Sequence, residues 1–190
     1  MLVYFIRHGE TENNSNGVYT GQMDIHLSSR GFEQAKKIRD KFSDKKIDKI
    51  FSSDLIRAVE TAETVFPNRV IERDSRLREI DVGNLSGKNS KEFRNNNPDM
   101  LKFLDNRDYT PFGGENDSDV LARLSDFLDE LSQQTCDAVA VFCHGGVLHT
   151  SLECALEVSI SPWRTSRPNC AIVVYELSPD KTMKLMAWNV

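Results

Sequence analysis

The chain has 190 residues, of which 39% are hydrophobic and 28% are charged, and its formal net charge is −5. This length suits one domain with a hydrophobic core. The negative charge argues against a general nucleic-acid binder, whose affinity would depend on neutralising phosphates. The apolar start meets Arg7 and His8 too early for a signal peptide, and no apolar run reaches the roughly 18 residues of a membrane span. We therefore expect a cytoplasmic protein with no nucleic-acid partner and no membrane partner.

The cysteine pattern gives no sign of a disulfide framework or a metal site. Cys136, Cys143, Cys154 and Cys170 show neither C-x-x-C nor zinc-finger spacing and lie mostly in apolar runs, so we expect reduced packing residues. Because no histidine has further ligands at tight spacing, we expect no metal and no other cofactor. The sequence does not specify an oligomeric state.

The first half of the chain alternates between strand-like and helix-like patterns. Residues 7–26 are polar and rich in turn formers, which predicts a loop. Apolar spacing predicts a helix over residues 28–42 and another that has Asp54 as its N-cap and ends before Pro67. The strands predicted in this half cover residues 2–6, 47–51 and 70–71.

The second half repeats this alternation after an unusual stretch. Residues 84–117 are polar and contain Asn, Pro and Gly, so we interpret them as an excursion over the sheet edge. Two short helices are predicted in this stretch, around Lys91 and over residues 99–104. Later helices are predicted at about 118–133 and 147–157, and later strands at 138–143, 171–176 and 183–188.

Strands that alternate with helices of ten or more residues indicate a parallel sheet covered on both faces. The predicted fold class is therefore α/β, a three-layer α/β/α sandwich with a mostly parallel central sheet. We expect one domain over residues 1–190, with residues 84–117 covering the substrate.

Polar side chains follow the predicted strands at the points where ligands bind in such sheets. The first strand ends in Arg7-His8-Gly9, and a later one ends in His144-Gly145-Gly146. Arg57 follows the second strand by about one helical turn, and Glu79 comes after the third. Two histidines, two or more arginines and one carboxylate are thus expected at one rim, from four separate segments.

This set suits a phosphate ester. The planar guanidinium groups of Arg7 and Arg57 match the oxygens of a phosphoryl group. A neutral imidazole at His8 can attack phosphorus, and we expect the two guanidinium charges to keep it neutral. His144 is expected to donate to the phosphate as an imidazolium. Glu79 is expected to protonate the leaving oxygen and then to activate water.

The same residues resemble the histidine phosphatase superfamily, whose fold is phosphoglycerate mutase-like. Its signature R-H-G-E-[TS]-x-x-N is matched at Arg7–Thr11 with Asn14. Further matching motifs follow in the order that the family requires: Thr20-Gly21-Gln22, Ser52-Ser53-Asp54-Leu55 with Arg57-Ala58, Leu77-Arg78-Glu79, Gly113-Gly114-Glu115 and His144-Gly145-Gly146-Val147. The sequence departs from the pattern at Gly83-Asn84-Leu85-Ser86-Gly87, where similar phosphatases read G-x-W-E-G.

The resemblance implies a metal-independent histidine acid phosphatase-type hydrolase that acts on phosphoric monoesters. It implies His8 as the nucleophile and Glu79 as the proton donor, with substrate-side contacts at Gln22 and Gly21. The phosphate pocket that it implies consists of Arg7, Asn14, Arg57 and His144. The expected partner is a small phosphorylated metabolite, such as a phosphosugar, a phosphoglycerate, α-ribazole phosphate or phosphoserine.

Two other functions stay open from the sequence. A phosphoglycerate mutase-type enzyme would use the same phosphohistidine and return the group to another hydroxyl, behind a lid that excludes water. A binding module would keep the phosphate pocket without turnover. His26 and His149 lack comparable neighbours and are expected to be structural or exposed. The basic residues of the excursion are expected to form mainly a solvated face: Lys88, Lys91, Arg94, Lys102 and Arg107.

Overall fold

A six-stranded mixed sheet forms the centre of the protein, in a computed structural model that describes residues 1–160 and 165–190. Its strands are β1 (Leu2–Arg7), β2 (Lys49–Ser52), β3 (Glu72–Arg73), β4 (Ala138–Cys143), β5 (Ile172–Leu177) and β6 (Met183–Trp188). Their order is β3-β2-β4-β1-β5-β6. The first four in this order pair in parallel, whereas β5 runs antiparallel to both of its neighbours. The predicted mostly parallel sheet is confirmed.

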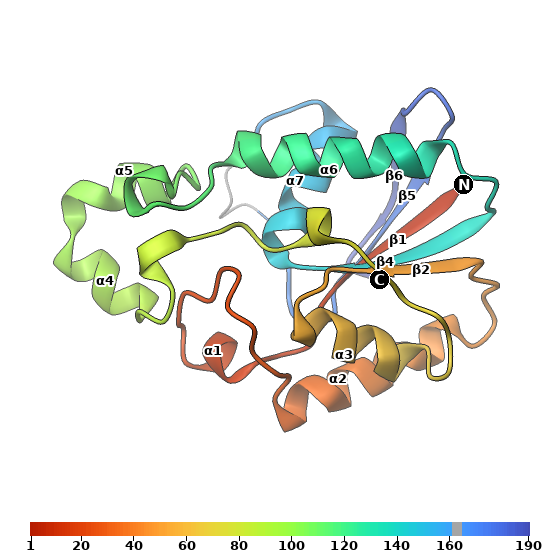
Figure 1. The fold of residues 1–190 in the computed structure, drawn as a ribbon, viewed down its shortest axis with the longest axis horizontal. Coiled ribbons are helices and arrows are strands. Elements are labelled where there is room, and N and C mark those ends of the chain that lie inside the picture. The colour runs from red at the N-terminus through yellow and green to blue at the C-terminus, as the bar shows by residue number, and fades with distance from the viewer. Residues whose placement is uncertain (161–164) are drawn as a thin grey trace.

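Helices cover both faces of this sheet, as the sandwich prediction required (Figure 1). One face carries α2 (Ser29–Arg39) and α3 (Ile56–Val65), and the other carries α6 (Asp117–Ser132) and α7 (Gly145–Leu156). Successive β4 side chains enter opposite cores because strand side chains alternate between faces. Val141 packs on the α6 and α7 side, and Phe142 packs on the other. The apolar run therefore marks a strand buried on both faces.

Several local boundaries differ from the predictions. The presumed loop contains α1 (Glu12–Ser15), a single turn that Thr11 and Asn14 close in a capping box. The helix α3 follows Leu55 without a side-chain cap, because the Asp54 carboxylate pairs with Arg78 instead. The third strand occupies Glu72–Arg73 and not residues 70–71. It is a short strand at the edge of the sheet, and both of its residues are polar and exposed. The apolar residues Val70 and Ile71 therefore did not mark its position.

Residues 84–117 contain α4 (Ser90–Asn96) and α5 (Leu101–Leu104), which confirms the two short helices. Leu85, where similar phosphatases carry an aromatic residue, is fully buried in a small core with Val82 and Leu104. This apolar cluster attaches the segment to the residues that follow Glu79. Short 3-10 helices lie at Asp40–Phe42, Ser75–Leu77, Gly83–Leu85, Pro98–Met100 and Thr110–Phe112.

None of the helices that the structure describes is both long and apolar enough to cross a bilayer. All four cysteines are free, and Cys143 and Cys170 are buried, in agreement with a packing role.

Candidate active site

A cavity of about 670 Å³ lies where the sequence predicted convergence, at the carboxyl ends of the central strands. Four separate segments bring predicted residues to its wall. These lining residues are Arg7, His8, Asn14, Gly21, Arg57 and Glu79, together with Gly145 and Gly146. Gln22 and His144 are not among the lining residues.

The His8 ring is buried, with 3% of the residue exposed, and it lines the cavity. Its Nδ1 lies 2.6 Å from the carbonyl oxygen of Gly9. Because a carbonyl only accepts, we assign the ring proton to Nδ1, which leaves the lone pair on Nε2. Burial, followed by the charges of Arg57 and Arg7, lowers the pKa of His8 well below its usual value of 6.5. The expected neutral imidazole follows, although burial contributes more than the guanidinium charges.

The loop that carries His8 is fixed by two close contacts. The Gly9 N–H donates to Thr61 Oγ1 on α3 at 3.0 Å. A side chain on Gly9 would place its Cβ 2.6 Å from the Gly31 carbonyl oxygen. The start of α2 can therefore pack against the loop only because both positions are glycine.

Arg57 is almost completely buried and is held through backbone carbonyls. It donates to Met23 at 2.7 Å and to Gly21 at 2.8 Å. Burial lowers the pKa of Arg57 to about 10, so the guanidinium stays charged at neutral pH. Arg7 donates to the carbonyl of Arg167. The Nε atoms of Arg7 and Arg57 are buried and make no hydrogen bond with the described residues, so each keeps a donor for an anion.

Glu79 lies at the N-terminus of α7. Its Oε1 accepts the N–H groups of Gly146 at 2.9 Å and of Ile80 at 2.9 Å. A helix N-terminus favours a carboxylate because the N–H groups and the helix dipole point toward it. The Gln22 amide donates to the Glu79 carbonyl at 3.2 Å. Gln22 thus holds the backbone of Glu79, whereas Gly21 lines the cavity and supports Arg57.

Asn14 is positioned by a second asparagine that the sequence analysis missed. Asn14 Oδ1 accepts from the backbone N–H of Thr11 and from Asn169 Nδ2, both at 3.1 Å. Asn169 also donates to the carbonyl of His8 at 3.2 Å. Asn169 comes from the loop before β5, beyond the last motif that the sequence analysis used, so nothing in the sequence pointed to it.

The His144 ring is fully buried, and its centroid lies 5.1 Å from that of His8. Neither ring nitrogen makes a hydrogen bond with the described residues. Burial, followed by the charge of Arg57, lowers the pKa of His144 well below 6.5. The expected imidazolium is therefore wrong for this structure, which favours the neutral ring, because a buried charge between cations is costly.

Two arginines of the excursion also line the cavity, contrary to the expected solvated face. Arg107 is only 6% exposed and donates to the carbonyl of Gly146 at 3.2 Å. Arg94 pairs with Asp105 at 2.6 Å. Tyr109 and Arg167 line the cavity as well. Residues 84–117 have the polar composition of a surface loop, so the sequence did not indicate that Arg94, Arg107 and Tyr109 line the cavity. Only the folded structure shows it.

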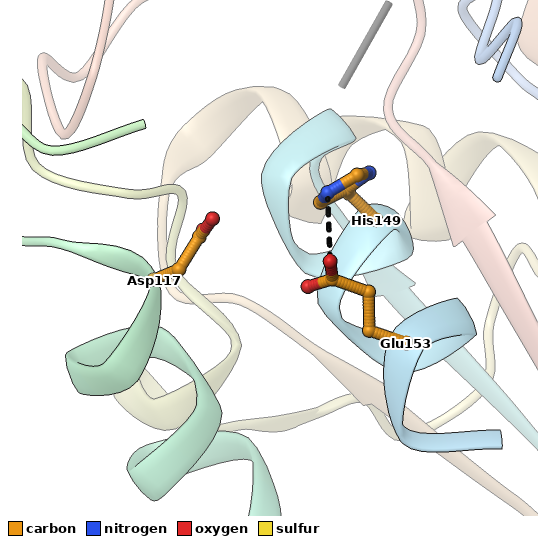
Figure 2. Close-up of side chains that lie close together, drawn as sticks. All are labelled: Asp117, His149 and Glu153. Carbon is orange, nitrogen blue, oxygen red and sulfur yellow. Dashed lines mark ion pairs between the residues drawn. The ribbon is translucent and has the colours of Figure 1, made fainter. Parts of the chain in front are cut away.

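His149 was expected to lack neighbours of the metal-ligand type, and the structure corrects this expectation. This buried residue lies with Asp117 and Glu153, and one ligand atom of each falls within 4.8 Å of the others (Figure 2). Asp117 comes from α6, so sequence spacing did not reveal it. A guanidinium nitrogen of Arg107 already lies 3.0 Å from Asp117 Oδ1. This cation opposes the binding of a metal ion, so we assign no metal to the group.

Comparison with known proteins agrees with the fold. Residues 3–190 match the sequence profile of the histidine phosphatase superfamily (branch 1). Phosphoserine phosphatase 1 of Hydrogenobacter thermophilus is 32% identical over 155 residues, which cover 80% of this chain and 74% of that protein. The 2,3-bisphosphoglycerate-dependent phosphoglycerate mutase of Nitrobacter hamburgensis is 32% identical over 199 residues, covering 96% and 94%.

Solved structures give the same relationship. The mycobacterial glucosyl-3-phosphoglycerate phosphatase in complex with VO3 superimposes with a TM-score of 0.89 at 26% identity, covering 100% of this chain and 98% of that one. The match of sequence profile, relatives and fold spans nearly all of the chain. The chain belongs to the histidine phosphatase superfamily.

Proposed function

We propose that this protein is a metal-independent phosphomonoesterase that hydrolyses a small phosphorylated metabolite through a phosphohistidine on His8. The observation that carries this proposal is the position of the His8 ring, whose Nδ1 is directed at the Gly9 carbonyl oxygen, in a cavity lined by Arg7, Arg57 and Glu79. The relatives act, by their names, on phosphoserine and on glucosyl-3-phosphoglycerate. Both compounds are small phosphate monoesters.

In the first step, the Nε2 lone pair of His8 attacks phosphorus while the ester P–O bond breaks. Arg7 and Arg57 hold the phosphoryl oxygens and balance their charge, which is the main requirement of phosphoryl transfer. The protonated Glu79 gives its proton to the leaving oxygen, so the alcohol departs uncharged. Asn14 supplies an amide to the same phosphoryl group, and the neutral His144 ring, behind the cavity wall with its centroid 5.1 Å from that of His8, supports the nucleophile from that side.

In the second step, water attacks the phosphorus of the phosphohistidine. The Glu79 carboxylate takes a proton from that water, and the N–P bond breaks to release inorganic phosphate. His8 recovers its lone pair and Glu79 recovers its proton, so the cycle closes without a cofactor. Residues 84–117 contribute Arg94, Leu104 and Arg107 to the wall of the cavity. We propose that this segment covers the bound substrate within a single domain.

The test is to trap the intermediate. Brief incubation with a ³²P-labelled monoester, followed by denaturation, should leave acid-labile label on His8. The His8→Ala variant should carry no label and should not release phosphate. A fully active His8→Ala enzyme would overturn the proposal, and so would the absence of both label and turnover, because the latter would leave only a binding module.

A second candidate is the mutase reaction, which the Nitrobacter hamburgensis relative favours by its name. It shares the first step and differs in the acceptor of the phosphoryl group. Incubation with 3-phosphoglycerate distinguishes the two, because a phosphatase releases inorganic phosphate whereas a mutase accumulates 2-phosphoglycerate. We expect phosphate release to dominate.

A further inference from the structure

We propose that Asn169 is a positioning residue for the phosphoryl group. Its side chain fixes the amide of Asn14 so that the amide NH2 is presented to the phosphate. This role rests on the proposed phosphatase function and adds to it a residue that lies outside all of the matched sequence motifs. Asn169 acts through Asn14 and donates no hydrogen bond of its own to the phosphate.

The backbone of His8 determines which way the Asn169 amide is turned. A backbone carbonyl oxygen only accepts hydrogen bonds, and the His8 carbonyl oxygen lies 3.2 Å from the Asn169 amide. The Asn169 atom at this distance is therefore the nitrogen Nδ2, although the two ends of an amide have nearly the same shape. The Cys170 N–H donates to the same carbonyl at 3.2 Å. Asn169 and Cys170 thus hold the residue that carries the proposed nucleophile.

The second hydrogen of the Asn169 amide fixes the orientation of Asn14. An amide nitrogen carries two hydrogens. One reaches the His8 carbonyl, and the other reaches Asn14 Oδ1 at 3.1 Å. The backbone N–H of Thr11 lies 3.1 Å from the same Asn14 atom. Because two donors meet this end of the Asn14 amide, this end is the oxygen and the NH2 lies at the other end.

The NH2 of Asn14 is available to a ligand. Asn14 lines the cavity, as do Arg7 and Arg57, and its Nδ2 has no hydrogen-bond partner among residues 1–160 and 165–190. An N–H that donates to an anion makes a strong, charge-assisted bond, whereas a reversed amide would direct an acceptor at the anion. Asn169 also lines the cavity, but both of its amide hydrogens are already used. It is therefore a positioning residue and not a phosphate ligand.

The backbone around Asn169 holds its side chain in place. Asn169 is the second residue of a turn that the Ala171 N–H closes on the Pro168 carbonyl at 3.0 Å. The third residue, the buried Cys170, has a φ of +60°, in the left-handed region that residues other than glycine rarely adopt. Such strain persists where the surrounding structure determines the backbone, and it is common at functional sites. The turn therefore supports a positioning role.

Phosphate binding tests the assignment without turnover. Asn169→Asp keeps the shape of the side chain but replaces its donor with an acceptor, so Asn14 should turn its NH2 away from the phosphate. We expect the dissociation constant of inorganic phosphate and the inhibition constant of orthovanadate to rise by about tenfold or more, the usual effect of losing one charge-assisted bond. Asn97→Asp is the matched control. Asn97 donates to the carbonyl of Phe93 at 2.8 Å and does not line the cavity, so both constants should stay at the wild-type values.

A double-mutant cycle separates the positioning role from the added negative charge and from a general effect on the loop. In the Asn14→Ala background, Asn169→Asp should raise the phosphate dissociation constant at least about threefold less than it does in the wild type, because the residue through which Asn169 acts is gone. Equal effects in the two backgrounds would overturn the proposal. Unchanged phosphate binding in Asn169→Asp would overturn it as well.

NMR of the side-chain amides tests the orientation in the wild-type protein, whether or not the variants fold. Inorganic phosphate should shift the NH2 resonances of Asn14, which are identified by their absence in Asn14→Ala, and should shift those of Asn169 much less. A larger shift at Asn169, or phosphate binding without a shift at Asn14, would contradict the assignment. The proposed phosphatase function is judged separately, by label on His8 and by release of phosphate from p-nitrophenyl phosphate.

Discussion

Gly146 donates its backbone N–H to Glu79 Oε1 at 2.9 Å, and any side chain at position 146 would place its Cβ 2.1 Å from the same oxygen. The two residues are far apart in the chain. Because Gly146 has no side chain, the Glu79 carboxylate can approach the backbone N–H of Gly146 and is held there. The start of α7 therefore positions the proposed proton donor directly.

The Gly146→Ala variant should lose activity on alkyl phosphates by about 10²-fold or more, because the displaced Glu79 can no longer protonate the leaving oxygen. The loss should be smaller for p-nitrophenyl phosphate, whose leaving group needs no proton. The free energy of unfolding should change little, because the higher helix propensity of alanine partly offsets the cost of displacing Glu79. Gly145→Ala is the control, since its Cβ would meet its nearest atom at an ordinary 3.5 Å. Equal losses in both variants would contradict this interpretation.

The Thr61→Val variant should lower the free energy of unfolding by about 1–3 kcal/mol, the cost of leaving a buried group unpaired. Thr61 Oγ1 accepts from Gly9 at 3.0 Å and donates to the carbonyl of Arg57 at 2.6 Å. Activity should also fall because the His8 loop loses its tie to α3. Urea denaturation and steady-state kinetics measure both effects. Thr64 lies on the same helix, and its hydroxyl donates to the carbonyl of Glu60, so Thr64→Val should cost less and leave kcat unchanged.

The Arg123→Met variant should lower kcat by at least about tenfold with a smaller change in KM. Arg123 donates to the carbonyls of Arg76 and Glu79 and pairs with Glu115 at 3.1 Å. It thus holds the backbone of the proposed proton donor without lining the cavity, so its loss should misplace a group that acts in the chemical step. Arg69→Met removes comparable backbone contacts far from the site and should leave kcat unchanged. A rise in KM alone would show that Arg123 acts on binding.

Stability should fall as the pH drops below about 6.5. The pKa values of His8, His144 and His149 are all lowered in the fold, mainly by burial, and that of His149 falls to about 3. The unfolded chain therefore binds more protons than the folded chain below pH 6.5, which reduces the free energy of unfolding by up to about 1.4 kcal/mol per pH unit for each histidine. Burial raises the pKa of Asp117 to about 6, and the hydrogen bond to Glu60 raises the pKa of His26, so these two groups oppose the trend.

Urea denaturation at pH 7.5 and pH 5.5 measures this effect. His149→Gln should make the fall less steep. His26→Gln is the control: His26 is exposed and its pKa is raised by the hydrogen bond to Glu60, so its removal should leave the fall at least as steep. Constant stability between these pH values would show that the rings are not neutral in the fold.

Phosphatase activity should be unchanged after dialysis against EDTA. The reason is that arginines hold the proposed phosphate site, and that Arg107 opposes a cation beside Asp117 and His149. Assaying the dialysed enzyme before and after the addition of Zn²⁺ or Mn²⁺ checks this expectation. Loss of activity that one of these metals restores would contradict the metal-independent mechanism.

The sequence alone determined the elements and much of the wall of the site. The apolar run over β4 and the helical spacing over α6 are local sequence patterns. A strand buried on both faces needs apolar residues throughout, and a helix buried along one stripe needs them at helical spacing. Polar residues directly after such strands reach the same rim in any parallel sheet. For this reason Arg7, His8 and Gly145 could be placed together before the fold was known.

Tertiary structure alone decided the contacts between distant segments. The burial of Arg107, the grouping of Asp117 with His149, and the support that Gln22 gives to the backbone of Glu79 depend on how separate elements pack. The ionisation of His144 also depends on packing, because burial lowers its pKa well below the usual value for a histidine. Sequence spacing carries no information on such distances, because packing brings together side chains that lie many residues apart.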